Sequence, residues 1–352
     1  PPIVEGLANR ESGRALAAND PVRVASISKL VMALAALRLA DAGKVDLDRD
    51  VSDYLGWRLR SPFHPEAPVT LAHLLTHRAG LSDKAGYIVP LGESLAAKLA
   101  DPAAWRETGA PGEAAHEYAN LGSPLVATAL EAAAGERYDD LLERLVFAPL
   151  GITACVNWTR CDEAVKARAV TLYRHTGEIA RDDPADLACP IAIVEGRVCS
   201  LADYVPGTNA SIFSPQGGVR IGMVDLARLG QALAKLPGSG FLAPETHRRW
   251  LASAELDAQG ARVECGYGLG LKRIEATDLA CDDPLFGDGA ARIGHAGEAY
   301  GLRSGLWLDP ASGEGVAFFT TAVPPPVGGE DTGGFDPREV ALIARARALM
   351  QP

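Results

Sequence analysis

The chain has 352 residues, of which 47% are hydrophobic and 22% charged, and its formal net charge is −11. This balance is typical of a globular protein and excludes a disordered or fibrous chain, and the length is sufficient to bury a substantial core. The negative charge disfavours a phosphate backbone as partner, and the longest apolar run, 30–37, falls far short of a membrane span. We therefore expect neither nucleic-acid binding nor a membrane-spanning helix.

The first predicted elements are a strand end and turn within residues 1–25 and a helix over 28–42. The helix is apolar around nearly its whole circumference, which predicts that it lies buried in the centre of the protein. Gly43 stands where a helix commonly ends. Further helices are expected at 70–77, 93–100, 122–134 and 137–146.

Strand patterns return in the C-terminal third. Residues 267–271 alternate large and small side chains, as in a close-packed strand. Segments 304–309 and 315–321 predict a hairpin around a Pro310–Gly313 turn. A final helix is expected with Asp336 as its cap and Pro337 at its first position.

The order of these elements predicts a mixed α/β fold of the α+β type, an antiparallel sheet flanked by helices plus an all-helical subdomain. We expect one catalytic unit whose sheet is completed by both chain ends. Its sheet-and-helix part would comprise 1–55 and 215–352, and its mostly helical part 56–214. An active site would lie in the cleft between the two parts, because ligand pockets often form in such places.

Six cysteines are spaced as three local pairs: Cys155 with Cys161, Cys189 with Cys199, and Cys265 with Cys281. No pair has zinc-ligand spacing and no histidine flanks them suitably, so a structural zinc site is not indicated. Buried free thiols are one interpretation. Three disulfides, which would indicate a periplasmic or secreted protein, are the interpretation we favour, although six cysteines permit 15 connectivities.

The first set of candidate residues is Ser26-Ile27-Ser28-Lys29, where the apolar helix begins. Residues three apart share a helix face, so the Ser26 hydroxyl and the Lys29 ammonium can lie side by side. A serine hydroxyl needs such a neighbour to become a nucleophile. Taken alone, this spacing more often belongs to a helix cap and a solvated lysine, but an unpaired charge before an apolar helix would be costly.

Two further strings could carry chemistry. Tyr118 and Asn120 flank one small residue and point the same way in an extended segment; a phenol near a lysine can accept a proton, and an amide both donates and accepts. Gly294-His295-Ala296-Gly297 precedes the predicted hairpin, where small residues would let a ligand lie against the strand. Each alone is also compatible with a structural role.

The ordered set resembles the three signatures of the serine beta-lactamase and penicillin-binding-protein superfamily. Tyr118 follows Ser26 by 92 residues and His295 follows Asn120 by 175, which suits the class C-like branch. The segments 74–81 and 216–228 resemble further conserved stretches of that family. The resemblance covers nearly the whole chain.

The resemblance implies roles for these residues. Ser26 would attack a carbonyl and become acylated, Tyr118 would act as general base and Lys29 would keep the pKa of its phenol low. Asn120, His295, Ala296 and Gly297 would bind the substrate. The backbone N–H groups of Ser26 and Glu298 would form the oxyanion hole.

One departure from the family pattern bears on the substrate. Class C beta-lactamases usually have Lys-Thr-Gly at 295–297, and the histidine and alanine found here remove a fixed charge and a hydroxyl, while Glu298 adds a carboxylate. His-x-Gly is similar to esterase, D-aminopeptidase and D,D-peptidase relatives. The implied function is a serine hydrolase acting through an acyl-enzyme on a small or peptide-like ester or amide, with weak or no beta-lactamase activity.

Several alternatives stay open. A genuine class C-type beta-lactamase and a catalytically silent secreted binding protein would share this scaffold. His73 and His77 have a spacing that can bind zinc, but no third ligand is evident, so we interpret His77 as structural and expect no metal and no cofactor. The 25 residues before Ser26 are fewer than relatives usually have, which implies a front segment preceding Pro1.

Overall fold

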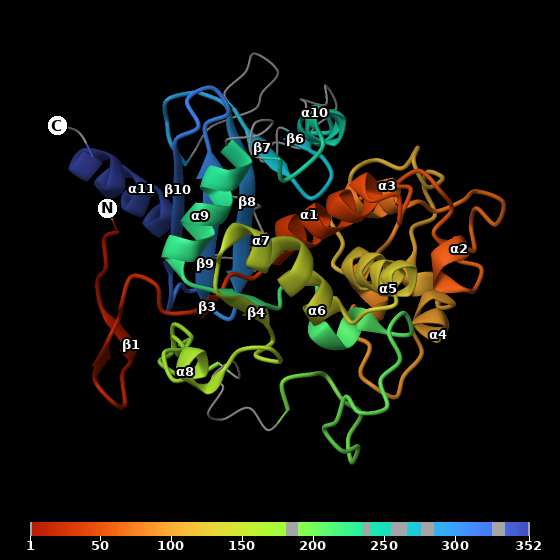
Figure 1. Cartoon of the computed structure of the whole chain (residues 1–352), viewed down its shortest axis with the longest axis horizontal. Coiled ribbons are helices and arrows are strands. Elements are labelled where there is room, and N and C mark those ends of the chain that lie inside the picture. The colour runs from red at the N-terminus through yellow and green to blue at the C-terminus, as the bar shows by residue number, and fades with distance from the viewer. Residues whose placement is uncertain are drawn as a thin grey trace.

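The computed structural model describes residues 2–180, 189–234, 240–254, 266–275, 285–325 and 335–350. Helix α1 (Ile27–Asp41) runs through the middle of the molecule, with a sheet on one side and mainly helices on the other (Figure 1). The predicted class, an antiparallel sheet flanked by helices with a helical part beside it, is confirmed.

The main sheet has five antiparallel strands in the order β10-β9-β8-β7-β6. Helix α9 (Met223–Ala234) packs on β9 and β10, and α1 contacts β8 and β9, so the centre of the sheet is covered by helices (Figure 1). The predicted hairpin is confirmed as β9 and β10, which pair from Leu308↔Gly315 onward. The strands are β6 (Gly266–Tyr267), β7 (Lys272–Ile274), β8 (Arg292–Ala299), β9 (Leu302–Leu308) and β10 (Gly315–Thr320).

Two strand predictions were wrong. The N-terminal strands do not complete the main sheet: β1 (Leu7–Asn9) pairs with β2 (Arg14–Ala15), and β3 joins a second, three-stranded sheet. Residues 267–271 do not form one strand, because the chain turns between β6 and β7, where the Gly268 N–H donates to the Leu271 carbonyl at 2.9 Å. Gly270 has a φ of +66°, which extended strands do not adopt. The three-stranded sheet has the order β3 (Val22–Arg23), β5 (Val219–Ile221), β4 (Ala154–Val156).

The helical part follows the predicted pattern with shorter elements. The stretch predicted as a helix over 137–146 is α6 continued by a π-helical turn, η3. The remaining helices are α2 (Ser52–Leu55), α3 (Leu71–Leu75), α4 (Leu95–Leu99), α5 (Gly122–Ala134), α6 (Tyr138–Leu142), η3 (Glu143–Phe147), α7 (Ala148–Leu150), α8 (Glu163–Lys166), α10 (Pro244–Ala252) and α11 (Pro337–Met350), and the 3-10 segments are η1 (Asp83–Ala85), η2 (Pro102–Ala104) and η4 (Ala210–Phe213).

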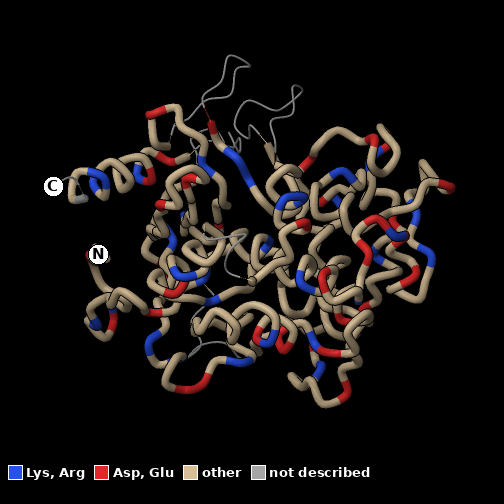
Figure 2. Tube along the Cα trace, turned by 45° about the horizontal axis from the view of Figure 1, so that its top comes forward, with Lys and Arg blue, Asp and Glu red and all other residues tan. Residues whose placement is uncertain are grey.

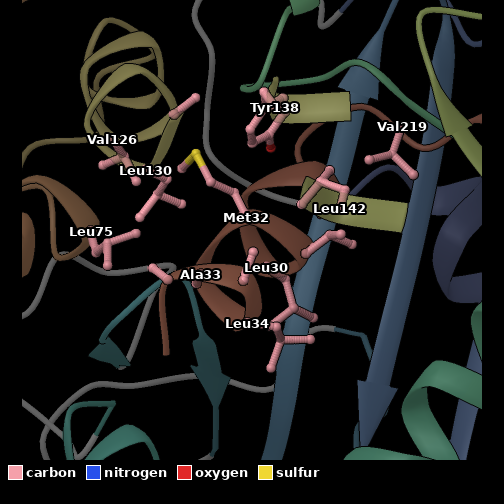
Figure 3. Close-up of a cluster of buried hydrophobic side chains, with 14 of the residues drawn as sticks. Leu30, Met32, Ala33, Leu34, Leu75, Val126, Leu130, Tyr138, Leu142 and Val219 are labelled. Carbon is pink, nitrogen blue, oxygen red and sulfur yellow. The ribbon is translucent and has the colours of Figure 1, made fainter. Parts of the chain in front are cut away.

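The core is built around α1, as its apolar circumference predicted. Helix α1 contacts α5, α6 and η3 on the helical side and β8 and β9 of the main sheet. Figure 3 shows part of the buried cluster around it and labels Leu30, Met32, Ala33, Leu34, Leu75, Val126, Leu130, Tyr138, Leu142 and Val219. Burying one leucine side chain contributes roughly 1.5–3 kcal/mol to the free energy of unfolding. The helix that carries Ser26 and Lys29 is therefore held from all sides.

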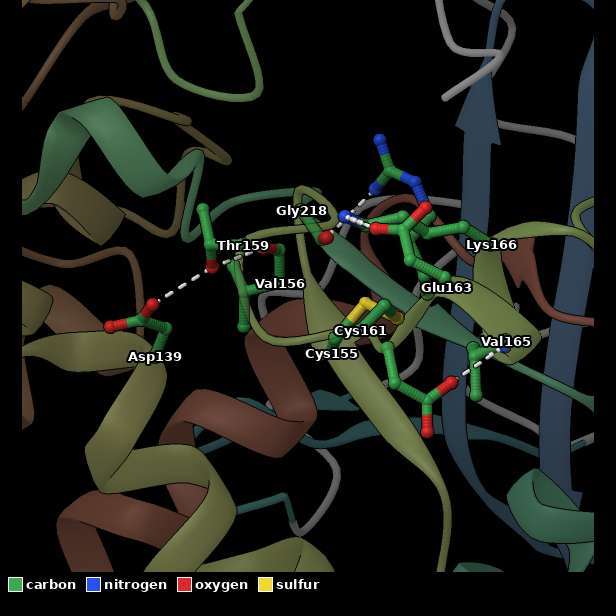
Figure 4. Close-up of a disulfide and its surroundings, with 11 residues drawn as sticks. Asp139, Cys155, Val156, Thr159, Cys161, Glu163, Val165, Lys166 and Gly218 are labelled. Atoms are coloured by element: carbon green, nitrogen blue, oxygen red, sulfur yellow. Dashed lines mark hydrogen bonds and ion pairs between the residues drawn. A yellow bond between two sulfur atoms is a disulfide. The ribbon is translucent and has the colours of Figure 1, made fainter. Parts of the chain in front are cut away.

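Two of the expected disulfides are present. Cys155–Cys161 joins the middle of β4 to the segment before α8, with Cα atoms 5.4 Å apart, beside the hydrogen bond from the Thr159 hydroxyl to Asp139 (Figure 4). Cys189–Cys199 closes a loop beside the helical part. The third expected pair, Cys265 and Cys281, lies outside the described residues.

The last helix, α11, begins as predicted, and the charged residues that the structure describes form no single-sign region in Figure 2. In α11 the Asp336 N–H donates to the Glu339 carboxylate at 2.8 Å, which is the predicted start. Acidic and basic residues are interspersed over both parts of the molecule (Figure 2). Among the described helices, none is long and apolar enough to cross a membrane.

Candidate active site

Ser26 sits at the first turn of α1, on a turn that is itself strained. Ala25 has a φ of +46°, in the left-handed region that residues with a Cβ rarely adopt. Ser26 stands at the N-cap position, yet its side chain makes no capping hydrogen bond. Its hydroxyl is half-buried and is not used to satisfy the helix terminus. The interpretation of Ser26 as an ordinary helix cap is therefore not supported.

Lys29 lies on the same face of α1 and is only 2% exposed. Its ammonium donates to Ser26 Oγ at 3.2 Å, to Asn120 Oδ1 at 2.8 Å and to the Gln216 carbonyl at 3.2 Å. Three acceptors satisfy the three protons of a buried ammonium, which offsets the cost of its burial. The expected pairing of Ser26 with Lys29 is thus what the structure contains, and Asn120 joins it from a distant segment.

Tyr118 lies against Lys29 within a cluster of aromatic rings. The Lys29 ammonium is 4.5 Å from the centroid of the Tyr118 ring. The His77 ring is 4.4 Å from that of Tyr118, and the Tyr267 ring is 5.9 Å away. A second ammonium, that of Lys272, lies 5.2 Å from the Tyr118 centroid. Two cations and two rings therefore lie around this side chain, and nearby positive charge favours the charged form of an acid.

Asn120 is oriented by a residue that the sequence analysis missed. Its Nδ2 donates to Asp83 Oδ2 at 3.0 Å, and its backbone N–H donates to the same oxygen at 2.9 Å. The Leu121 N–H donates to Asp83 Oδ1 at 2.9 Å. With Oδ1 held by Lys29, these bonds fix which end of the amide is the oxygen. Asp83 belongs to no motif, and nothing in the sequence marks this first residue of η1 as a partner of Asn120.

His295 is not where we expected it. The family resemblance implied that His295 binds the substrate, but its side chain is fully buried. Nδ1 lies 2.6 Å from the Ala296 carbonyl, which only accepts, so Nδ1 carries the proton and Nε2 accepts from the Tyr267 hydroxyl at 3.1 Å. Burial and the nearby charges of Lys272 and Lys29 hold the pKa of His295 well below its usual range. The His295 ring therefore lies beneath the site, in contact with the Tyr267 hydroxyl and the Tyr118 ring.

His77 belongs to the site as well as to the structure. It has a φ of +53°, and Nδ1 accepts the Ala119 N–H at 3.2 Å, which ties it to the Tyr118 segment. Burial, followed by the charge of Lys29, keeps its pKa well below the usual value. His73 instead caps α3 through Thr70. In the described part of the chain no group of three or more potential ligands could hold a metal ion.

The predicted ligand-binding strand lies directly beside the nucleophile turn. A Cβ on Gly297 would be 2.2 Å from the Val24 carbonyl oxygen, and the hydroxyl of Ser304, the β9 partner of Gly297, donates to that carbonyl at 3.0 Å. Glu298, the next residue, directs its side chain to Arg303 at 2.8 Å and so away from the backbone position expected to bind the oxyanion.

Two residues besides Asp83 escaped the sequence analysis. Tyr267 and Lys272 face each other across β6 and β7, and both contact the Tyr118 ring. They belong to no motif, and the strand predicted at 267–271 separated them wrongly. A hairpin assignment for this segment would have placed them side by side.

Comparison with known proteins identifies the family of the chain. The family model described as Beta-lactamase matches residues 3–336. The chain belongs to the beta-lactamase family. Penicillin-binding protein 4 of Amycolatopsis lactamdurans is 25% identical over 320 residues, covering 90% of this chain and 76% of that protein. Esterase EstB of Burkholderia gladioli is 44% identical over 78 residues, 22% of this chain and 20% of the esterase.

Solved structures show the same fold. A D-amino acid amidase from Ochrobactrum anthropi SV3 superposes with a TM-score of 0.66 at 21% identity, covering 98% of this chain and 90% of the amidase. A class C beta-lactamase from Rhodobacter sphaeroides superposes with a TM-score of 0.65 at 19% identity, covering 99% of this chain and 90% of the other. The predicted resemblance to the serine beta-lactamase and penicillin-binding-protein superfamily is confirmed by the family model, and the solved structures confirm the fold.

Proposed function

We propose that this beta-lactamase-family protein is a serine acyl hydrolase of the esterase or D-amino-acid peptidase type. The observation that carries the proposal is the contact of Lys29 with Ser26 Oγ at 3.2 Å beside the Tyr118 ring. The alternative function, a catalytically silent binding protein, would not need a buried lysine directed at a serine whose hydroxyl makes no capping hydrogen bond. Esterase EstB and the D-amino acid amidase, by their names, mark such activities within the similar proteins.

The proposed reaction has two steps. Ser26 Oγ attacks the carbonyl carbon of an ester or amide while its proton passes to the Tyr118 phenolate oxygen, with Lys29 stabilising the charges on both. Backbone N–H groups of Ser26 and Glu298 stabilise the oxyanion, and the intermediate expels the alcohol or amine, which takes the proton. Water then attacks the acyl carbon while Tyr118 takes its proton, the bond to Ser26 Oγ breaks, the carboxylic acid leaves and the proton passes to Oγ.

Efficient beta-lactam hydrolysis is not proposed, because position 295 lacks a lysine and its histidine is buried away from the site surface. The two disulfides support a periplasmic or secreted location. The division into a part of 1–55 with 215–352 and a part of 56–214, with the site between, remains our proposal for the organisation of the chain.

The test compares hydrolysis of p-nitrophenyl acetate, a D-alanyl p-nitroanilide and a chromogenic cephalosporin by the wild type and Ser26→Ala. We expect Ser26-dependent turnover of the ester or the D-amino-acid anilide and little or none of the cephalosporin. A cephalosporin preference of several orders would assign the protein as a class C-type beta-lactamase. No Ser26-dependent turnover of any of the three would favour the silent binding protein.

A further inference from the structure

We propose that Lys272 is a positioning residue for Tyr118, a second cation that keeps the phenol deprotonated at neutral pH. This proposal rests on the proposed function and extends it to a residue that no motif contains. Lys272 comes from β7, whereas Lys29 comes from α1, so the two cations reach Tyr118 from independent elements. Because the two lysines lie on different elements, Lys272 can be replaced without changing α1, and its contribution can be measured separately.

The ammonium groups of Lys29 and Lys272 both lie close to the ring of Tyr118. Lys29 Nζ is 4.5 Å and Lys272 Nζ is 5.2 Å from the centroid of the Tyr118 ring. Lys29 is in addition bound to Ser26, Asn120 and the Gln216 carbonyl. Replacing Lys29 would therefore disturb the nucleophile as well, whereas Lys272 contacts the rings of Tyr118 and Tyr267.

The hairpin that carries Lys272 is pressed against the nucleophile helix. A Cβ on Gly270 would lie 2.6 Å from the Ala33 Cβ and 2.9 Å from the Lys29 carbonyl oxygen, so only glycine permits this approach. The Gly270 N–H donates to the Leu75 carbonyl at 3.1 Å. Two residues later the chain reaches Lys272, which is opposite Gly294 on β8. The position of the Lys272 backbone is thus set by the close packing of the hairpin on α1.

Helix α10 holds the hairpin from the other side. The Trp250 indole N–H donates to the Leu269 carbonyl at 3.1 Å, and the Leu269 N–H donates to the Ser253 hydroxyl at 2.9 Å. Trp250 is fully buried. The β6–β7 turn is therefore clamped between α10 and α1, and Lys272 extends from a rigid base.

The two lysines act on Tyr118 among several other titratable groups. Among the described residues, the histidines in ring contact, His77 and His295, have pKa values well below the usual range and are neutral at pH 7. The carboxylate of Asp83 is bound to the Asn120 and Leu121 amides, and that of Glu117, the chain neighbour of Tyr118, pairs with Arg106. The titratable groups facing Tyr118 are Lys29 of α1, His77 after α3, Tyr267 of β6, Lys272 of β7 and His295 of β8, with His116 on its own segment.

Removing one of two cations at this distance has a calculable effect. The Lys272 ammonium lies 5.2 Å from the centroid of the ring that carries the phenol oxygen. A charge at roughly such a distance from a phenolate in a partly solvated site shifts its pKa by about one unit, a tenfold change in the deprotonated fraction. The acid limb of kcat/KM for a neutral ester reports that fraction in the free enzyme. Because a deprotonated Tyr118 accepts the Ser26 proton directly, the midpoint of the acid limb reports the pKa of the Tyr118 phenol.

The experiment measures kcat/KM for p-nitrophenyl acetate from pH 5.5 to 10 for the wild type, Lys272→Met, Lys272→Arg and Lys44→Met. Lys44 is an exposed lysine after α1 and serves as the matched control. We expect Lys272→Met to move the acid limb up by about one pH unit, to lose about tenfold at pH 7 and to recover to within about twofold at pH 10. Lys272→Arg and Lys44→Met should keep the wild-type midpoint.

A lowered plateau with an unmoved midpoint in Lys272→Met would overturn the proposal, because it would indicate a merely structural role. An unchanged profile would overturn it as well. The proposed function is checked separately in the same assay: wild-type turnover that persists in Ser26→Ala would reject the function, whereas Ser26-dependent turnover with an unmoved limb would reject only the role of Lys272.

Discussion

Gly297 of β8 touches Val24, two residues before the nucleophile: the Cβ that Gly297 lacks would lie 2.2 Å from the Val24 carbonyl oxygen. Real side-chain carbons do not approach an oxygen so closely, so a side chain at 297 must displace either the strand or the turn. The same carbonyl accepts the Ser304 hydroxyl at 3.0 Å. The distance between the nucleophile turn and the strand is therefore set by the absence of a side chain.

We predict that Gly297→Ala lowers kcat/KM for p-nitrophenyl acetate by at least about 100-fold, because a displacement of about 1 Å in a catalytic arrangement has effects of this size. The matched control is Gly122→Ala in α5, where the added Cβ would meet its nearest neighbour at 3.6 Å, an ordinary contact. Steady-state rates of both variants decide the matter. Near-wild-type activity of Gly297→Ala would refute the close approach.

Asp83 is predicted to be required for a correctly held Asn120. Asp83→Asn replaces one acceptor oxygen by an NH₂ group that repels the donors it faces, and hydrogen bonds to charged groups contribute about 1.5–3 kcal/mol each. We expect kcat/KM to fall about tenfold or more and the melting temperature to drop by several degrees. Asp53→Asn, an exposed carboxylate on α2, should change neither. An Asp83→Asn protein with wild-type rates would contradict the assigned role.

The two buried histidines predict a loss of stability in acid. His77 and His295 have pKa values well below 6.5 in the folded state, whereas unfolded histidines protonate near 6.5. Below that pH the unfolded chain binds more protons, so the free energy of unfolding falls as pH decreases through 6.5. Urea unfolding at pH 7.5 and 5.5 should show a smaller decrease for His295→Gln than for the wild type. An equal decrease would contradict the burial of a neutral His295.

Glu131 predicts the opposite pH dependence of stability: its contribution to the free energy of unfolding falls as pH rises. Burial raises its pKa to about 7, although its carboxylate accepts the Tyr204 hydroxyl at 2.5 Å and the Gly207 and Tyr138 N–H groups at 2.8 Å. Between pH 4.5 and 7 the folded chain binds more protons, so this group lowers the free energy of unfolding as pH rises, by up to about 3 kcal/mol.

Urea unfolding of Glu131→Gln tests that sign. The variant lacks the titration, so the stability advantage of the wild type over Glu131→Gln should be larger at pH 5 than at pH 8. Asp53→Asn again serves as the control, because its exposed carboxylate should leave the difference unchanged. A wild-type advantage that is the same at both pH values, or larger at pH 8, would contradict the raised pKa.

The sequence predicted the parts of the site that follow local rules. Ser26 and Lys29 are three apart on one helix, so helical geometry alone brings them together. The apolar circumference of α1 predicted its central position, and the Pro310–Gly313 turn predicted the β9–β10 hairpin. The spacing of the cysteines predicted the two disulfides at Cys155–Cys161 and Cys189–Cys199.

What escaped the sequence analysis depends on distant segments. Asp83 reaches Asn120 from 37 residues away. Lys272 reaches Tyr118 because Gly270 lets a tight turn press on α1, and alternation of large and small residues is shared by a strand and by such a turn. His295 was expected to bind the substrate because its small neighbours suggested an open strand. That pattern does not reveal that the ring is buried and that its Nε2 atom accepts the Tyr267 hydroxyl.

The measurement that tests the central claim most directly is intact mass after incubation with a fluorophosphonate, for the wild type, Ser26→Ala and Ser28→Ala. Ser28 is the matched control because it lies two residues away, fully buried, with its hydroxyl accepting the Val219 N–H at 3.0 Å. The account predicts one adduct on the wild type and on folded Ser28→Ala, and none on Ser26→Ala. An adduct that survives in Ser26→Ala, or a folded wild type that stays unlabelled, would contradict the assignment of Ser26 as an activated nucleophile.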